Sequence, residues 1–373
     1  MSQYSLRLIS EHLACEGHYY PESAYFSPDG QTIIFPVRNP SKEPKDHCIF
    51  TSHDGGKTFE KSFDDFVRFA VLKDGTAWAA VGGNFVFDKF RRTQFPIPYI
   101  GKVMTAKTPE DMISGNYNED FAKVSIPDLA VGYGDGNNAH SGCFDHGIVE
   151  LENGDILCTM YGQFRQDKNR VPFIPGEYYQ YRSWVVVTHD RGQSFEYLST
   201  LADANTWPLP EYAEGYCEPD LIKLQDGSLF SVMRSGGFYE GKDNCYTPLY
   251  CVRSTDDGKT WSKPAAINWH GVYPKAVQTQ NGAIIVTAGR DGQYICAGNE
   301  DGTEWSEPLY LTKNKGTWGQ VPSGYASLNV TGENEVTLIY DDGCEEWYAG
   351  IENPEKGSHH KVFIARFEVV KND

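Results

Sequence analysis

Three arginines stand at equivalent positions in this chain, and their chemistry suits the capture of an anion. Each follows a short Asp-Gly or Asn-Gly turn signal by about eight residues, and the three are Arg38, Arg234 and Arg290. An arginine binds a carboxylate through two parallel hydrogen bonds and keeps its charge in proteins. If the three turns occupy equivalent places in a repeated fold, the guanidinium groups converge and predict a site for an acidic ligand. Coincidence or structural salt bridging is the alternative interpretation.

A second group of residues could move protons at the same end of the fold. It combines histidines with tyrosines and carboxylates: His18, Tyr19, Tyr20, Glu22, Asp145 and His146. Beside arginines that neutralise a uronate, a His–Tyr pair suits a polysaccharide lyase, in which Tyr or His moves the proton α to the carboxylate. We expect His18, Glu22, Asp145 and His146 to bind substrate, unless each histidine is purely structural. The spacing offers no distinctive metal-ligand motif, so no metal or other cofactor is predicted.

Six short repeats must position these residues. Each reads as an apolar strand, a tight turn and a second apolar strand, and the six are centred on 27–38, 71–83, 150–162, 223–234, 278–290 and 329–342. Asp-Gly and Asn-Gly fit the positive-φ positions of a two-residue hairpin turn, so each segment is predicted to be a β-hairpin. A short helix is expected within 108–122, and the long stretches 106–144 and 163–180 are expected to wall the site.

A second repeat lies between the hairpins. Three segments, SHDGGKTF (52–59), THDRGQSF (188–195) and STDDGKTW (254–261), share one pattern, and GNEDGTEW (298–305) is a degenerate fourth copy. The Asp can accept hydrogen bonds from turn amides, and the Gly supplies an unusual backbone angle. These segments resemble the Asp box of sialidases and related propellers, where they are structural turns.

Together the repeats predict an all-β fold, a six-bladed β-propeller with four-stranded antiparallel blades. The final strand at 360–369 and the first at 4–9 can pair in one blade and close the ring. Residues 1–373 are therefore predicted to form a single domain.

The resemblance to the sialidase superfamily covers most of the chain in architecture, and its specific motifs lie mainly in the C-terminal half. Sialidases carry arginines on the first, fourth and fifth blades that clamp a sugar carboxylate, and the three arginines above fall on those blades. CEPDLIKLQDGSLFSVMR (217–234) is similar to the sialidase segment in which a Glu precedes the second arginine. SGYASLNVTGENEVTLIYDD (323–342) is similar to the stretch that carries a nucleophilic tyrosine.

This resemblance implies roles for individual residues. Tyr325 would be the nucleophile and Glu218 its base, because a neutral phenol must lose its proton as the glycosidic bond breaks. The first-arginine motif is Arg-Ile-Pro in sialidases and FPVRNP here, so Arg38 rests on its register. The acid/base Asp usually lies on a longer loop after that arginine; Asp46 is the first candidate for this role and Glu43 the second.

The resemblance thus implies an exo-acting retaining glycoside hydrolase that removes a terminal acidic sugar, such as sialic acid, from a glycan. Two alternatives stay open: a lyase or other glycosidase acting on uronate- or rhamnose-containing glycans, and a non-catalytic carbohydrate-binding propeller. Single residues also have alternative interpretations. Tyr325 could be an aromatic residue of the core, and Glu218 could be a structural partner of Arg234.

The composition excludes some classes of binding partner and indicates a cellular compartment. The formal net charge of −18 argues against nucleic acid and anionic membranes as partners. No run of about 18 apolar residues and no secretory signal is visible, so a soluble, cytoplasmic protein is expected. Nine scattered cysteines include Cys158, Cys251 and Cys296 within predicted strands, where thiols are expected to be small buried hydrophobes.

Overall fold

The protein is described by a computed structural model, in which β-strands dominate. It describes residues 3–18, 20–38, 47–63, 68–81, 99–127, 129, 143–164, 166–171, 179–239, 242–244, 247–289, 292–312, 322–343 and 360–372. Within these ranges the strands are accompanied by one five-residue α-helix, α1 (Pro109–Ile113). The prediction of an all-β fold is confirmed, and the short helix lies within the predicted stretch.

The chain divides into two compact units. Unit 1 comprises Met1–Phe66 and Ile267–Asp373, and unit 2 comprises Val67–Ala266. Each unit is described by itself below, and the single domain over 1–373 stays a prediction.

Unit 1 contains three four-stranded antiparallel sheets. Their strands are β2 (Tyr25–Phe26), β3 (Ile33–Arg38), β4 (His47–Ser52) and β5 (Glu60–Ser62); β20 (Val272–Gln278), β21 (Ile284–Gly289), β22 (Tyr294–Gly298) and β23 (Leu309–Tyr310); and β24 (Ser327–Gly332), β25 (Glu335–Asp341), β26 (Lys361–Lys371) and β1 (Tyr4–Glu16). The first two sheets follow chain order, whereas the third has the order β1-β26-β25-β24. The N-terminal strand therefore completes a sheet made by the C-terminal ones.

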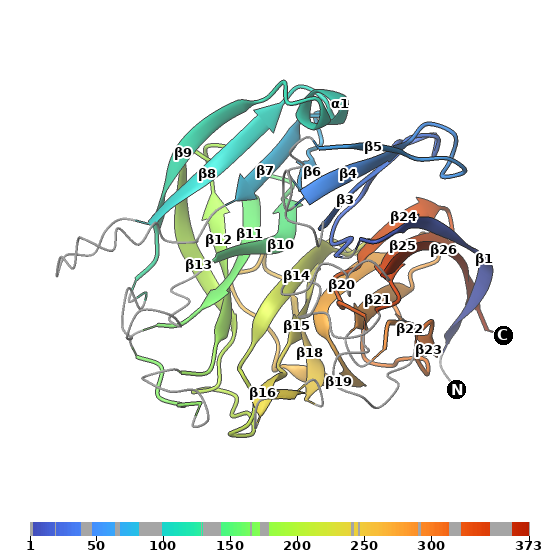
Figure 1. Cartoon of the computed structure of the whole chain (residues 1–373). Coiled ribbons are helices and arrows are strands. Elements are labelled where there is room, and N and C mark those ends of the chain that lie inside the picture. Colours follow the sequence, from blue (N-terminus) through green and yellow to red (C-terminus); the bar gives the residue numbers. More distant parts are fainter. Residues whose placement is uncertain are drawn as a thin grey trace. The chain divides into compact units, whose positions relative to one another are not determined.

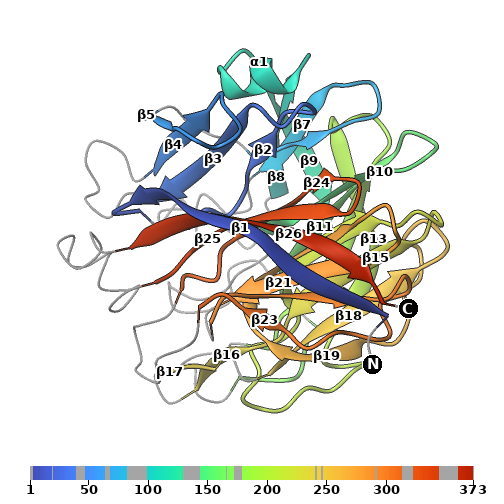
Figure 2. The same cartoon turned by 90° about the vertical axis from the view of Figure 1, so that its right-hand side faces the viewer.

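The pairing of β1 with β26 confirms that the two ends of the chain meet in one sheet. The two strands run antiparallel, with Tyr4 opposite Lys371 and Glu16 opposite Lys361. Figure 2 shows them side by side, with the N and C termini near each other. Tyr4 is fully buried there, and its hydroxyl donates to the carbonyl of Asn281 over 2.7 Å.

Unit 2 contains an eight-stranded sheet and smaller sheets. The strands of the large sheet are β6 (Ala70–Val71), β7 (Ala77–Val81), β8 (Tyr99–Ala106), β9 (Asn118–Ser125), β10 (Cys143–Glu150), β11 (Ile156–Gly162), β12 (Arg182–Thr188) and β13 (Ser194–Ala202). The others are β14 (Cys217–Lys223), β15 (Leu229–Arg234), β16 (Gly237–Tyr239), β17 (Lys242–Asn244) and β18 (Pro248–Ser254), while β19 (Ala265–His270) crosses into unit 1. Figure 1 shows β7, β8 and β9 side by side, with α1 between β8 and β9 along the chain.

The large sheet joins two antiparallel runs of four strands. Its order is β10-β11-β12-β13-β9-β8-β7-β6, and β13 pairs with β9 in parallel through Ser194–Glu196 and Lys123–Ser125. Because this pairing makes one sheet out of two runs, the count of six blades stays a prediction.

All six predicted hairpins are present, but the turn type differs from the predicted one. In the turn at Leu151–Asp155, the amide of Gly154 donates to the carbonyl of Leu151, and the amide of Leu151 donates to the carbonyl of Asp155. Only Gly154 has a positive φ, at 89°, so the loop has three residues with one left-handed glycine. The two-residue turn is therefore wrong here and at the equivalent turns with Gly75, Gly227 and Gly282, whereas two residues separate the paired Gly332 and Glu335 in the last hairpin. The side chain of Asn153 accepts from the amide of Asp155 over 3.1 Å, which stabilises the longer loop.

The second repeat forms four hydrogen-bonded turns. In three of them the aspartate accepts from the backbone amide four residues later over 2.9 Å, at Asp54, Asp190 and Asp256. A hydroxyl two residues before each aspartate donates to it over 2.8 Å. In the fourth turn, the amide of Thr303 donates to Asn299 over 2.9 Å and to Asp301 over 3.0 Å. The donors hold the pKa of Asp54 and Asp256 below the ordinary value, Thr58 and Thr260 being the first cause.

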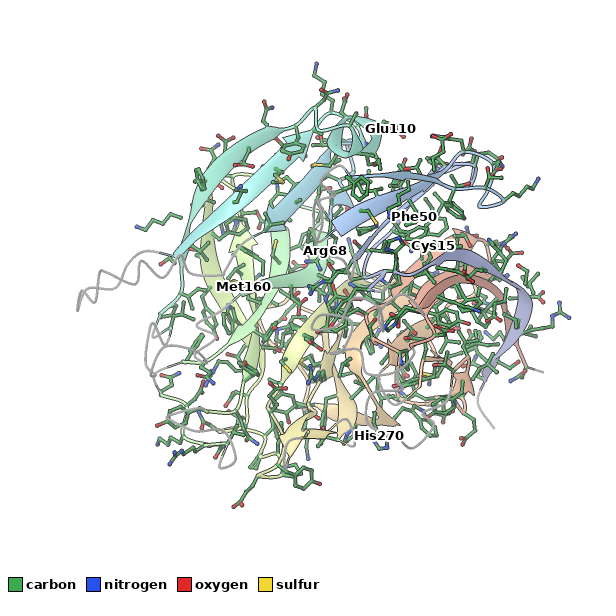
Figure 3. All side chains as sticks on the ribbon, in the orientation of Figure 1. Cys15, Phe50, Arg68, Glu110, Met160 and His270 are labelled. Atoms are coloured by element: carbon green, nitrogen blue, oxygen red, sulfur yellow. The ribbon has the colours of Figure 1, made fainter. Side chains whose placement is uncertain are left out.

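Aromatic and aliphatic side chains fill the core of each unit. In unit 2, Trp78, Trp184 and Met160 (Figure 3) belong to one fully buried cluster. In unit 1, Cys15 and Phe50 (Figure 3) belong to a second hydrophobic cluster. Burial of each large side chain contributes about 1.5 to 3 kcal/mol. The expectation of buried thiols is confirmed at Cys158, Cys251 and Cys296, and burial raises the pKa of Cys251 to about 12. Among the described residues, no helix has the length and hydropathy to cross a membrane.

Candidate active site

In unit 1, Tyr325 lies between two other tyrosine rings. Its ring centroid is 4.3 Å from that of Tyr20 and 4.4 Å from that of Tyr273, with interplanar angles of 34° and 29°. Tyr325 is half-buried just before β24, and its amide donates to Oγ of Ser323 over 3.2 Å. Both faces of the Tyr325 ring are therefore covered by neighbouring tyrosine rings.

A cation closes each end of this tyrosine stack. The guanidinium carbon of Arg38 lies 4.5 Å from the centroid of Tyr20, and Nζ of Lys275 lies 4.6 Å from that of Tyr273. Both distances are within the range of a cation–π interaction. Nε of Arg38 is buried and has no hydrogen-bond partner among the described residues. Arg38 thus reaches the stack at the end of β3, where its register predicted a site residue.

The backbone is strained at the two outer tyrosines. Tyr20 has φ of 62° and Tyr273 has φ of 50°, values that side-chain-bearing residues rarely adopt. In unit 2, Glu218 has φ of 48°. Each of these residues is followed by a proline: Pro21, Pro274 and Pro219. Such strain persists only where surrounding structure holds it, and it clusters at ligand-binding sites.

A buried carboxylate anchors one side of the stack. Asp341, at the end of β25 and 1% exposed, accepts hydrogen bonds from the amide of Ser323 over 2.8 Å and from the Ser323 hydroxyl. It also accepts from the amide of Tyr20 over 3.5 Å. Nδ1 of His360 lies 4.0 Å from Asp341. Asp341 therefore links Tyr20 to the segment that carries Tyr325.

Two glycines bring the end of β21 against the same segment. A Cβ added to Gly289 would lie 2.4 Å from Cα of Gly324, so only glycine fits there. Arg290, the third predicted arginine, follows directly but lies outside the described residues, as does Asp46, the predicted acid/base.

His18 and Glu22 are also in unit 1, and neither belongs to the stack. His18 is buried, with Nε2 3.1 Å from Nζ of Lys61 and its ring 5.3 Å from that of Phe50. Burial, and secondarily Lys61, lowers the pKa of His18 to about 4. This environment is typical of a structural histidine. Glu22 is half-buried, and its side chain forms no ion pair with a described residue. Their roles in substrate binding stay predictions.

In unit 2, Arg234 lies between two buried carboxylates. Its Nη1 donates to Oε1 of Glu218 over 3.0 Å, and its Nη2 donates to Oε2 of Glu214 over 2.9 Å. Its Nε donates to the carbonyl of Gly236 over 3.1 Å. The side chains of Arg234 and Glu218 are 7% and 8% exposed. The predicted pair of Glu218 and Arg234 is thus in direct contact, and Arg234 has a second carboxylate partner in Glu214, which the sequence did not indicate.

Asp145 and His146 form a second polar cluster in unit 2. Nδ1 of His146 lies 2.5 Å from Oδ1 of Asp145, and Nε2 lies 3.9 Å from Oδ1 of Asp220. The carbonyl of Asp145 accepts from the guanidinium of Arg68, labelled in Figure 3. A Cβ on Gly147 would lie 2.7 Å from atoms of its neighbours, so glycine lets β10 pack closely and fixes His146 beside β14. Asp220 and Arg68 were not predicted.

An open hollow of about 510 Å³ lies on unit 2 beside the stretch 163–180. Its lining includes the polar side chains of Lys168, Asn169 and Asn205 and the buried Arg182. Nε of Arg182 donates to both carboxylate oxygens of Asp167, over 3.0 and 3.1 Å. The hollow is of a size typical of small-molecule sites. Whether 163–180 walls the active site stays a prediction.

Of the ten predicted site residues, eight lie within the described part of the chain. Arg38 and Tyr325 share the stack in unit 1, while two pairs in unit 2 are in contact: Glu218 with Arg234, and Asp145 with His146. Lys275 was missed, although Tyr273-Pro274-Lys275 and Glu218-Pro219-Asp220 share the order of a strained residue, proline and a charge. Across the described ranges, no three His, Cys, Asp or Glu side chains form a group suited to a metal ion.

Known proteins resemble this chain in structure but not in sequence. No family model matches the chain, and no curated protein matches it in sequence. A Dyadobacter fermentans protein of unknown function has a TM-score of 0.66 at 16% identity, over 98% of this chain and 99% of that one. A Hadza microbial sialidase has a TM-score of 0.55 at 12% identity, over 95% of this chain and 65% of that one.

A Penicillium chrysogenum α-L-arabinanase complexed with arabinobiose has a TM-score of 0.54 at 16% identity, over 95% of this chain and 98% of that one. Sialidases and arabinanases are thus both among the neighbours. At these identities the likeness concerns the fold alone: the chain has the all-β fold of propeller glycosidases.

Proposed function

We propose that this chain is a six-bladed propeller and a retaining glycoside hydrolase that removes a terminal acidic sugar from a glycan, with Tyr325 as the nucleophile. The observation that carries the proposal is the enclosure of the Tyr325 ring by Tyr20 and Tyr273. A tyrosine that served as a stacking platform for a sugar would leave one ring face open. Tyr325 offers its hydroxyl instead, which suits nucleophilic attack.

The reaction proceeds in two steps. The Tyr325 oxygen attacks the anomeric carbon, its proton passes to the Glu218 carboxylate, and the glycosidic carbon–oxygen bond breaks. The leaving oxygen takes a proton from an acid, for which Asp46 is the first candidate. Water then attacks the anomeric carbon of the tyrosyl-linked sugar and gives a proton to the deprotonated acid, while Glu218 returns its proton to the departing phenolate, so the sugar configuration is retained. The assignment of Glu218 rests on its register and on its fixed direction beside Arg234.

The acidic sugar is assigned from the charges of the predicted arginines. Arg234 is compensated by two carboxylates, so it contributes little net charge to an anion site. Arg38 forms no ion pair with a described residue and has an unsatisfied buried Nε, so it is the described arginine best suited to bind a carboxylate. Arg290 completes the proposed clamp.

A uronate-directed lyase is the second candidate, and the pairing of His146 with Asp145 favours it. A histidine held by a carboxylate can accept the proton α to a uronate carboxylate. In that reaction no covalent sugar adduct forms, and the product carries a new carbon–carbon double bond. A carbohydrate-binding propeller would give neither product.

The test compares two assays on one preparation. The protein is incubated with a fluorogenic sialoside, and separately with uronate-containing polysaccharides while the ultraviolet absorbance of an unsaturated product is recorded. We expect fluorophore release that is lost in Tyr325→Phe and kept in Tyr310→Phe, a half-buried tyrosine outside the stack. An absorbing product without sialoside cleavage would replace the hydrolase with the lyase, and silence in both assays would leave a different sugar or a binding role.

A further inference from the structure

We propose that Tyr20 and Tyr273 are positioning residues that hold the ring of Tyr325 in its reactive orientation, and that Arg38 and Lys275 clamp the two ends of this stack. The inference rests on the proposed function in one respect, the role of Tyr325 as nucleophile. The geometry of the stack itself belongs to unit 1 and is independent of that role.

The segment that carries Tyr325 is irregular. Tyr325 lies between Gly324, with φ of 82°, and the start of β24, so it precedes the regular strand. The hydrogen bond from its amide to Ser323 involves the backbone and not the ring. A nucleophile displaced by about 1 Å can lose about 100-fold in rate, so an enzyme gains from fixing the ring. Contacts on both ring faces do this.

The strained backbone at Tyr20 and Tyr273 indicates that these residues are tyrosines because their side chains are needed. A glycine at Tyr20 or Tyr273 would adopt the observed φ without strain. A tyrosine there costs folding free energy, which the protein recovers only if the side chain contributes something in return. At both positions the side chain stacks on Tyr325. Two segments far apart in sequence thus carry the same unfavourable backbone angle and deliver a ring to the same partner.

The cations fix the outer rings in turn. Lys275 is 9% exposed, and a cation near an aromatic face is attracted more strongly when it is removed from water. Tyr273 and Lys275 belong to the same irregular stretch of β20, where the pairing with β21 shifts register between Val272 and Lys275. This bulge lets both side chains reach the stack. On the other side, Asp341 holds the Tyr20 amide and Ser323, so both flanks are anchored.

The first measurement tests whether the three tyrosine rings stack, and it does not depend on enzymatic activity. Protein containing ring-labelled tyrosine is studied by nuclear magnetic resonance, and Tyr325→Phe identifies the Tyr325 signals. We expect the Tyr325 ring protons to be shielded by ring currents from both faces and to move downfield in Tyr20→Leu and in Tyr273→Leu. The control Tyr310→Leu removes a half-buried ring from β23 and should leave them in place. Unshielded Tyr325 protons in the wild type would overturn the stack.

The second measurement tests positioning. With the substrate cleaved by the wild type, we expect Tyr273→Leu to lower kcat by about 10- to 100-fold with little change in KM, because the ring is misplaced but binding groups remain. Tyr273→Phe keeps a stacked ring and should restore most of kcat; Lys275→Gln should lower kcat by a smaller factor. A kcat of Tyr273→Leu equal to that of Tyr310→Leu would overturn the positioning role. Thermal denaturation identifies variants that have lost the fold.

The two failures are distinguishable. If Tyr325→Phe retains full activity, the proposed nucleophile is wrong, while the ring-current shifts still report the stack. If Tyr325→Phe is inactive but Tyr20→Leu and Tyr273→Leu keep both their kcat and the shielding of Tyr325, the nucleophile stands and this inference fails.

Discussion

Replacing Arg234 with methionine should strongly destabilise the protein at neutral pH. The guanidinium compensates Glu214 and Glu218 at 2.9 and 3.0 Å, and the three side chains are 7%, 13% and 8% exposed in the order named. Methionine would remove the guanidinium from two carboxylates that are largely shielded from water. Removing one member of a buried ion pair typically costs about 3 to 5 kcal/mol, mostly because the remaining charge stays desolvated.

The pH dependence of this cost has a definite sign. In Arg234→Met the two nearby carboxylates resist ionisation, so their pKa values in the folded variant rise above those of the unfolded chain. The folded variant then binds more protons than the unfolded one, and its stability rises as pH falls through that range. We therefore expect the difference between wild type and variant to shrink on acidification.

Urea denaturation followed by tryptophan fluorescence, at neutral and at mildly acidic pH, measures this difference. The matched control is the triple variant Arg234→Met, Glu214→Gln and Glu218→Gln, which removes all three charges and should recover most of the lost stability. If Arg234→Met lies within about 1 kcal/mol of the wild type at neutral pH, as for an exposed pair, the buried triad is refuted.

Two further predictions concern unit 1. The pKa of His18 is lowered from 6.5 to about 4 in the folded protein, so between these pH values the unfolded chain binds more protons than the folded one. The free energy of unfolding therefore decreases as the pH is lowered through this window. Allowing for solvent screening, the loss at pH 5 is about 1 to 2 kcal/mol, and denaturant midpoints across pH should show that His18→Phe lacks it. Gly289→Ala should cost about 1 to 3 kcal/mol and disturb Tyr325, because its Cβ meets backbone at Gly324. A Gly289→Ala midpoint equal to that of the wild type would contradict this packing.

The hairpins were predictable because their signals are local. In five of the six segments an Asp-Gly or Asn-Gly pair between two apolar runs specifies a turn whatever the rest of the chain does, and all six hairpins are present. The turn subtype was not predictable from these dipeptides alone. At Gly154 and its equivalents, the glycine of the dipeptide takes the left-handed position of a three-residue loop. A two-residue loop could contain the same dipeptide and would differ in the register of the two flanking strands.

The site was predictable only in part, because its contacts join distant segments. Register drew attention to Arg38, and the resemblance to sialidases drew attention to Glu218 and Tyr325. The stacking of Tyr325 on Tyr273 and the compensation of Arg234 by Glu214 depend on packing between loops whose geometry no local pattern specifies. A residue with positive φ before proline is disfavoured in general, so the sequence offered no reason to expect one at Tyr273.

A covalent sugar adduct on Tyr325 would test the central claim most directly. A fluorinated, activated derivative of the cleaved acidic sugar slows the second step and traps the glycosyl-enzyme, and peptide mass spectrometry locates it. The account predicts one added glycosyl group per chain, carried by the peptide containing Tyr325 and absent in Tyr325→Phe. Turnover of the true substrate with no adduct, or an adduct on Glu218 or another carboxylate, would contradict it.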